Sequence, residues 1–479
     1  MQQPLIIQGG MGVAISDWKL ARTVAQLGQM GVVSGTGLSR VMTARLMDGD
    51  PDGHVRRALA HFPYPNLADQ ILGKYFIQGG KAPDEPYKNL PAYTLTPPQA
   101  LDQLTVIANF VEVWLAKEGH DGLIGINLLE KVQMPNMASL YGAMLAGVDY
   151  VLMGAGIPTQ IPGILECLAG HHAVSYRVDV AGATQDDDYR LPFDPQAIFP
   201  ELAEQVGPLR RPSFLPIISS VVLAKALLKR SEGAVDGFII EGPLAGGHNA
   251  PPRAGQLDAA GEPLYTDKDD VDLGKIRELG LPFWLAGNYG SAEGLQAALE
   301  AGAAGIQVGT AFAFCDDSGM EPGYRAAAVQ QALAGTVQVF TNPLASPTGF
   351  PFKTVLLDGT MTDPTVYQAR ERLCDMRFLR QVYKREDETL GYRCPSEPVE
   401  DYLKKGGTLE ETFGRTCLCN NLGAAAGFAQ VRRDGYVEKP LITAGNDLMN
   451  IGRFIPAGQS HYSAADVVRA LLRAVQRQP

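Results

Sequence analysis

The chain has 479 residues, 46% of them hydrophobic, which is enough to bury a large core as one domain with insertions or as roughly two or three smaller domains. A net charge of −11 and the lack of a Lys/Arg-rich run argue against nucleic acid or a membrane surface as a partner. Six cysteines in so long a chain do not indicate a disulfide framework, and residues 1–7 lack a basic leader, so we expect a cytoplasmic protein.

Eight short apolar runs recur along the chain, each ended by Gly, Ser or Asn and followed by a helical stretch. They cover residues 5–10, 31–35, 123–127, 150–154, 214–219, 237–242, 282–287 and 304–309. Near-continuous apolar strands that alternate with helices are typical of a parallel sheet covered by helices. Eight of them favour an α/β fold of the (β/α)₈ TIM-barrel type over an open sheet. Residues 176–180 are either a ninth strand or an inserted one.

The clearest strand–helix unit lies at residues 282–309. Ser291 is suited to cap a helix, Leu295, Ala298 and Leu299 supply an apolar face at helical spacing, and Gly302 is suited to end it. A new strand follows at once.

Three regions depart from the repeat. Residues 50–120 are rich in proline and end in an expected helix over 98–117, and residues 181–212 hold an acidic loop and further prolines. We interpret both as insertions into a barrel spanning residues 1–320. Residues 321–479 are expected to form an extra, mainly helical cap or lid that completes the barrel and ends in a helix over 464–476.

The loops after the seventh and eighth runs are suited to bind a phosphate group. Gly287 and Asn288 follow the seventh run, and Gly309 and Thr310 follow the eighth, where TIM barrels commonly bind phosphate. Glycine lets successive backbone N–H groups converge on an anion, and the Thr310 hydroxyl adds a donor. Ordinary tight turns are the alternative.

Two further strand ends are suited to a flat ring. Gly10, Met11 and Gly12 end the first run, where glycine lets the backbone lie along a ring and Met11 offers a soft apolar contact. Asn127 ends the third run and presents an amide, although a structural hydrogen bond would also explain it. Together with a phosphate loop, these residues predict a flat phosphorylated cofactor.

Three motifs, in this order, resemble the nitronate monooxygenase (2-nitropropane dioxygenase) family, which includes the FMN-dependent enoyl-acyl-carrier-protein reductases. They are PLIIQGGMGVAIS at the start, EGPLAGGHNAPP in the middle and PFWLAGNYGSAEGLQAALEAGAAGIQVGTAF afterwards. The resemblance covers roughly residues 1–50 and 120–315, with SPTGFPFK (346–353) similar to a later family loop. It implies an FMN-binding (β/α)₈ barrel.

The resemblance also assigns cofactor contacts. Gly10, Met11 and Gly12 would line the flavin ring, Asn127 would hydrogen-bond it, and Gly246 and Gly247 would approach it. The residues implied to hold the ribityl chain and phosphate are Gly287, Asn288, Gln307, Gly309 and Thr310. Glu241 stands at a cofactor-contact position where many members have glutamine, and a carboxylate there disfavours an anionic flavin unless it is protonated or hydrogen-bonded.

His248 is the expected catalytic residue. It follows two glycines after the sixth run, and an imidazole titrates near neutral pH. The resemblance implies that it faces the flavin and handles the substrate's proton. A loop histidine that caps a backbone carbonyl is the alternative.

Four late cysteines form a separate set: Cys374, Cys394, Cys417 and Cys419. Four thiols can bind zinc or an iron–sulfur cluster, but this spacing contains no familiar Cys-x₂-Cys pair. Buried structural thiols are the favoured interpretation, and whether a metal binds stays open.

The resemblance gives two enzyme hypotheses. In the first, FMN oxidises a nitronate or nitroalkane-like carbanion and O₂ reoxidises the flavin. In the second, NAD(P)H is the reductant for reduction of an enoyl group, and the partner is a carrier-bound acyl substrate rather than a free small molecule. A third hypothesis, which is not enzymatic, is a non-catalytic phosphate-binding barrel that serves as a partner subunit. Oligomeric state is open, with a homo-oligomer as one option.

Overall fold

A computed structural model of the chain, which describes residues 3–473 and 475, contains one sheet of eight parallel strands. These strands match the eight apolar runs. They are β1 (Ile6–Gln8), β2 (Gly31–Ser34), β3 (Ile124–Leu129), β4 (Tyr150–Gly154), β8 (Ser213–Ile218), β9 (Phe238–Glu241), β11 (Phe283–Ala286) and β12 (Gly305–Val308). The predicted (β/α)₈ barrel is therefore confirmed.

The sheet closes on itself between its first two strands. β1 pairs in parallel with β12 on one side, with Ile6 opposite Ile306. On its other side the Gln8 N–H donates to the Met30 carbonyl at 2.9 Å, and the Met30 N–H donates to the Ile6 carbonyl at 3.1 Å. The Gln8 side chain, which is fully buried, accepts the Val32 N–H at 2.9 Å. A closed barrel leaves its ligand site at one of its two ends.

Buried side chains fill the barrel interior away from its carboxyl end. Trp284 is 1% exposed, and its indole N–H donates to the Pro4 carbonyl at 2.8 Å. It packs with a cluster of other inward-facing residues: Ile7, Met30, Val32, Tyr150, Leu152, Leu215, Ile239 and Ala286. Because this layer is packed, open space is confined to the carboxyl ends of the strands.

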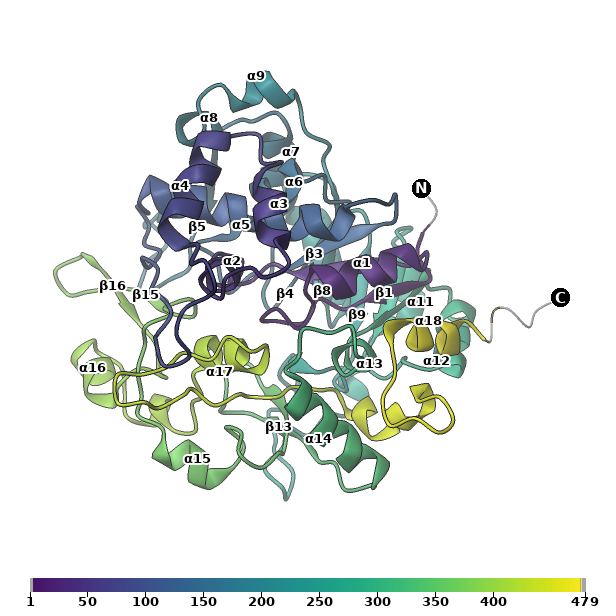
Figure 1. Cartoon of the computed structure of the whole chain (residues 1–479). Helices are drawn as coiled ribbons and strands as arrows, with labels where there is room; N and C mark the ends of the chain where they lie inside the picture. The colour runs from purple at the N-terminus through teal and green to yellow at the C-terminus, as the bar shows by residue number, and fades with distance from the viewer. Residues whose placement is uncertain (1–2, 474, 476–479) are drawn as a thin grey trace.

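Helices cover the outer face of the barrel. They are α1 (Trp18–Gln26), α2 (Leu38–Met47), α5 (Gln99–Lys117), α6 (Asn136–Leu145), α7 (Ile161–Ala169), α10 (Val221–Arg230), α11 (Leu273–Arg277), α12 (Ala292–Glu300) and α18 (Ala464–Leu472). The Ser291 side chain caps α12 by accepting the Gly294 N–H, as expected. The last helix, α18, packs between α12 and α1 and so closes the outer layer (Figure 1). Its expected C-terminal extension to residue 476 lies partly outside the described residues.

The two insertions add helices and a small sheet at the upper side of Figure 1. The first carries α3 (His54–Leu59) and α4 (Pro65–Tyr75), followed by α5, which begins one residue after the expected start. The second carries β6 (Val180–Ala181), β7 (Arg190–Phe193), α8 (Pro195–Ile198) and α9 (Leu202–Val206). β5 (Val174–Arg177) pairs antiparallel with β7, so the strand expected near residues 176–180 is an inserted one.

The C-terminal region combines helices with strands that the sequence does not predict. Its helices are α14 (Pro322–Leu333), α15 (Pro364–Ala369), α16 (Val399–Lys404), α17 (Leu418–Ala425) and the 3₁₀ helix η3 (Asn446–Phe454). Its strands are β13 (Val339–Asn342), β14 (Phe352–Val355), β15 (Gln381–Lys384) and β16 (Leu390–Arg393). β14 pairs with β13 and with β10 (Gly247–His248), a two-residue strand that follows β9. The C-terminal region is thus attached directly to the loop that carries His248.

Among the described residues, no helix is both long and apolar enough to cross a lipid bilayer.

Candidate functional site

A cavity of about 570 Å³ lies at the carboxyl ends of the barrel strands. Every residue that the sequence predicts to contact a cofactor or to be catalytic lines it. These residues are Gly10, Met11, Gly12, Asn127, Glu241, Gly246, Gly247, His248, Gly287, Asn288, Gln307, Gly309 and Thr310. The structure therefore brings the separate motifs of the sequence into one site.

The loop after β1 is held in a fixed shape against the rest of the barrel. The Ser16 hydroxyl accepts the Met11 N–H at 2.9 Å and donates to the Gly9 carbonyl at 2.8 Å. The Asn127 amide donates to the Gly10 carbonyl at 2.9 Å. A Cβ atom on Gly10 would overlap the Asn127 side chain, so this close approach requires glycine. The loop thus presents a fixed backbone surface to the cavity.

Three residues that line the cavity carry a buried amide oxygen with no hydrogen-bond partner among the described residues: Asn127 Oδ1, Asn249 Oδ1 and Gln307 Oε1. A buried acceptor left unpaired costs about 1–3 kcal/mol, so such atoms point to a bound group that donates to them. Asn127 lies two residues before the end of β3, because the strand continues to Leu129, beyond the expected end. Gln307 lies on β12, across the barrel.

The loops after β11 and β12 have the geometry expected of an anion site. Gly287 and Asn288 both have positive φ, +84° and +71°, which turns successive backbone N–H groups toward one side. The Thr310 hydroxyl oxygen accepts the Gly445 N–H at 2.8 Å, which leaves its own hydrogen free to donate.

A carboxylate also lies at this end of the cavity. Asp447 lines the cavity beside Gly290, and burial raises its pKa. Arg453 donates to the Asp447 carboxylate at 2.8 Å and to the Gly290 carbonyl at 3.1 Å. The guanidinium thus offsets the negative charge that Asp447 would place near a bound anion.

The segment 441–447 is part of the site and was missed from the sequence. Its Asn446 N–H donates to the Leu244 carbonyl at 3.2 Å, and a Cβ on Gly246 would lie 2.7 Å from the Gly445 nitrogen. The C-terminal region therefore lies directly on the glycine loop after β9. This segment does carry a signal in the sequence. It contains a mostly apolar run, Leu441–Ala444, that is followed by Gly445 and Asn446, and the same pattern marks the ends of the barrel strands.

His248 is held in place by strand pairing and by one side chain. It lies opposite Phe352 in the β10–β14 pair, and the two rings are 4.7 Å apart between centroids. Its Nε2 atom forms a 2.8 Å hydrogen bond with the Ser346 hydroxyl, which in turn contacts the Thr348 hydroxyl at 2.7 Å. Among the described residues Nδ1 has no hydrogen-bond partner. One ring nitrogen is thus anchored and the other is free for a ligand.

Burial lowers the pKa of His248 to about 4, because the low-dielectric surroundings disfavour the imidazolium form. His248 is therefore neutral at physiological pH. A neutral imidazole accepts a proton more readily than it donates one to carbon.

Glu241 and Lys353 are a second pair of titratable groups near the site. Burial raises the pKa of Glu241 to about 8, although the Lys353 charge opposes the shift, so the carboxyl group is mostly protonated at neutral pH. Burial also lowers the pKa of Lys353 to about 8. The Lys353 ammonium donates to the Pro243 carbonyl at 2.9 Å and to Asn446 Oδ1 at 2.5 Å. A protonated Glu241 carries no charge and so would not repel an anionic flavin ring.

The four late cysteines line a separate cavity of about 10 Å³ in the C-terminal region, and all are free thiols. Contact with Cys394 lowers the pKa of Cys374, whereas burial raises the pKa of Cys417. In residues 3–473 and 475, no group of three or more His, Cys, Asp or Glu side chains is arranged to hold a metal ion. The geometry favours buried packing thiols.

Fold and cavity together define a (β/α)₈ barrel with a glycine-lined ligand site at the carboxyl ends of its strands, where barrel enzymes bind their ligands. Residues 211–345, which include β8, β9, β11, β12 and His248, match the family model described as nitronate monooxygenase. The resemblance predicted from the motifs is confirmed over these residues, where the chain is similar to this family.

Curated relatives and solved structures are also similar to this chain. It is 30% identical over 152 residues to a nitronate monooxygenase of Pseudomonas aeruginosa, covering 31% of this chain and 40% of that protein. The chain thus spans less than half the length of this relative. A FabK structure from Thermotoga maritima aligns over 99% of this chain and 93% of its own, with 16% identity and a TM-score of 0.47. A nitroalkane oxidase from Streptomyces ansochromogenes aligns over 99% and 96%, with 16% identity and a TM-score of 0.46.

The pKa of His248 can be measured directly. Because the neutral ring is favoured by burial, its ring-nitrogen NMR shifts should stay constant from about pH 8 to about pH 5.5, whereas an ordinary imidazole titrates near 6.5. Long-range ¹H–¹⁵N spectra, assigned with His248→Ala, provide the measurement. A His248 signal that titrates between pH 6 and 7 would contradict the buried, neutral imidazole.

Proposed function

We propose that this chain is an FMN-dependent oxidoreductase whose reaction takes place in the large cavity. The observation that carries the proposal is the set of buried, unpartnered amide oxygens on residues that line the glycine-rich cavity, of which Asn127 Oδ1 and Gln307 Oε1 lie on barrel strands. A flavin ring carries an N–H donor, and the ribityl chain carries hydroxyl donors, so the cofactor can satisfy both atoms. The residues present fit FMN.

The cavity residues divide into those for the ring and those for the phosphate. Gly10, Met11 and Gly12 would form the surface along the ring, with Asn127 at its edge and Gly246 and Gly247 approaching it. Gly287, Asn288, Gly309 and Thr310 would hold the phosphate. When bound, FMN would supply the two-electron transfer.

His248 would bind or move the substrate's proton at Nδ1. Ser346 holds Nε2, and the rings of Phe352 and Phe350 pack edge-on against the imidazole, so its orientation is set before substrate arrives. At physiological pH the ring is neutral, and Nδ1 can take up the α-proton of a nitroalkane when Nε2–H donates to the Ser346 hydroxyl, although the same burial weakens the imidazole as a base. A nitronate has already lost that proton, so the ring would only orient it. We therefore propose oxidation of a nitroalkane or its nitronate, with O₂ as the electron acceptor, as the first activity.

Enoyl reduction with NAD(P)H is the second candidate. It is favoured by an apolar pocket that opens on His248 and suits the carbon chain of an acyl group. It is disfavoured as the first choice because the low pKa of His248 leaves no extra proton on the ring to deliver to carbon at neutral pH.

Anaerobic mixing distinguishes these two activities. We expect the absorbance of FMN-loaded protein to bleach when a nitronate is added and to change little with NADPH alone. Stopped-flow spectroscopy measures both rates. Rapid bleaching by NADPH, followed by recovery with an enoyl thioester, would assign the reductase activity instead.

The role of His248 is tested with two variants. With a neutral nitroalkane as substrate, His248→Ala should lower kcat by about 10²–10⁴-fold while FMN stays bound, since a positioned proton acceptor contributes that much. Oxidation of the preformed nitronate, which has no proton to give up, should change less. Ser346→Ala keeps the imidazole but frees Nε2, and should have a smaller effect on kcat. Unchanged turnover in His248→Ala would refute the proton-transfer role.

Glu241 makes FMN binding dependent on pH. Its pKa of about 8 means that the neutral carboxyl is lost above that pH, and a carboxylate would then face the flavin. If only the protonated form binds, FMN affinity should drop about fivefold between about pH 8 and about pH 9. Fluorescence titration with FMN measures the affinity of the wild type and of Glu241→Gln, which stays neutral throughout.

Lys353 titrates in the same range, because its pKa is also about 8. Glu241→Gln retains Lys353, so the variant separates the two groups. A flat pH profile in Glu241→Gln supports the assignment. If FMN affinity in Glu241→Gln still decreases with pH as it does in the wild type, the pH dependence belongs to Lys353.

A further inference from the structure

A second, smaller pocket of about 50 Å³ opens beside His248. It shares Val13, Thr36, Leu129, His248 and Leu422 with the large cavity, so the two are adjacent and the imidazole lies in the wall of both. The candidate reaction centre therefore has an extension that the proposed cofactor contacts do not occupy.

The wall of this pocket is almost wholly apolar and comes mostly from the C-terminal region. Phe378, Leu379, Leu418 and Phe428 line it, none of which lies in residues 211–345, the segment matched by the family model. Arg40 also lines the pocket. Its two terminal nitrogens donate to the Lys88 carbonyl and to Gln430 Oε1, both at 3.3 Å, and its Nε has no partner among the described residues.

An apolar wall decides which ligand the pocket accepts. Burying a polar group without a hydrogen-bond partner is unfavourable, whereas each buried methylene strengthens binding about fourfold. With about 10–15 Å³ per water-sized group, about 50 Å³ holds roughly three to five heavy atoms.

We propose that this pocket binds the apolar tail of the substrate, a carbon chain of roughly three to five heavy atoms beyond the carbon that reacts at His248. The inference rests on the proposed function for the location of the reacting carbon. It adds that the C-terminal region determines substrate chain length.

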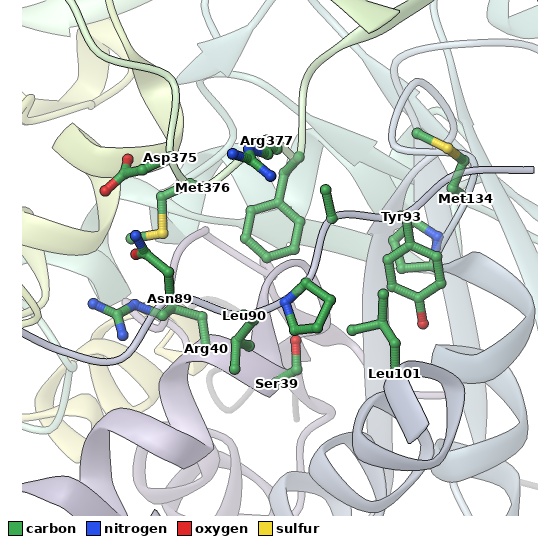
Figure 2. Close-up of a pocket in the computed structure, with 14 residues that line it drawn as sticks. Ser39, Arg40, Asn89, Leu90, Tyr93, Leu101, Met134, Asp375, Met376 and Arg377 are labelled. Atoms are coloured by element: carbon green, nitrogen blue, oxygen red, sulfur yellow. The ribbon is translucent and has the colours of Figure 1, made fainter. Parts of the chain in front are cut away.

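Phe378 lies in the wall of this pocket and in the wall of a second cavity of about 20 Å³. The two cavities also share Arg40 and Met376, and the second is bounded by Ser39, Leu90 and Leu101 (Figure 2). Removing the Phe378 ring would join the two. The pocket should then accept a longer chain.

Gly423 on α17 allows the opposite change. It lines the pocket, and the nearest atom to a Cβ built there is the Phe428 carbonyl oxygen at 3.7 Å, an ordinary contact. Gly423→Ala and Gly423→Val can therefore add carbon atoms to the pocket without a backbone clash. Gly73 on α4 is a matched control, because it is a helical glycine with nothing within 4 Å and lies outside the pocket.

The experiment measures kcat/KM of the FMN-loaded full chain for linear nitronates from nitroethane to nitrooctane, and for linear enoyl thioesters of matching lengths. In the wild type kcat/KM should rise about fourfold per methylene until the pocket is full, then level off or decrease. Phe378→Ala should move the optimum to longer chains, and Gly423→Val to shorter ones. Gly73→Ala should leave the profile unchanged.

A binding measurement separates failure of this inference from failure of the proposed function. If neither series reacts, the proposed function fails, but calorimetric binding of linear amides from acetamide to octanamide to the same protein should still strengthen with length. It should also respond to Phe378→Ala and Gly423→Val. A flat profile in binding, or a wild-type optimum that neither variant moves, would overturn the tail pocket.

Discussion

The site depends on a very short antiparallel pairing, in which Gly247 and His248 of β10 lie opposite Lys353 and Phe352 of β14. β10 follows the sixth barrel strand, whereas β14 belongs to the C-terminal region, about a hundred residues later in the chain. This pairing fixes the backbone of His248, brings Ser346 to its Nε2 atom and places Lys353 below the glycine loop. Without it the catalytic candidate would lie on an unsupported loop, so the C-terminal region completes the reaction centre as well as the outer helical layer.

Burial shifts the pKa values of three side chains at the site toward their uncharged forms. It raises the pKa of Glu241 and lowers that of His248 and of Lys353, so each shift favours the uncharged form. At neutral pH the imidazole of His248 and the carboxyl of Glu241 are therefore neutral, whereas Lys353, with a pKa of about 8, keeps most of its charge. The neutral imidazole holds no extra proton to donate at this pH.

Much of the barrel was predictable because its strands are buried on both faces and so read as continuous apolar runs ended by glycine or a polar residue. The same reasoning located the glycine loops after β11 and β12 and the Ser291 cap. The remaining parts depend on long-range contacts. β10 has only two residues, and β13 and β14 alternate with irregular loops, so no local pattern marks them.

Other features of the site could not be predicted from the sequence, because they too depend on contacts between segments distant in the chain. The pKa values of Glu241 and His248 follow from burial by segments distant in the chain, and the apolar pocket at His248 is assembled from α2, β3 and α17 together with the segment around Phe378. The run 441–444 followed by Gly445 did carry a readable signal. The division of the chain into a barrel over 1–320 and a cap over 321–479 stays a prediction, although β14 and α18 tie the two parts closely together.

The proposed oxidoreductase function depends most on FMN binding in the glycine-lined cavity. The most direct measurement is the visible spectrum of the purified full chain after incubation with FMN and gel filtration. We expect the two absorption bands of oxidised flavin, at a stoichiometry of one FMN per chain. Gly10→Val should lose these bands, because the valine side chain would overlap Asn127. A protein that retains no flavin would contradict both oxidoreductase activities and would favour a non-catalytic phosphate-binding barrel.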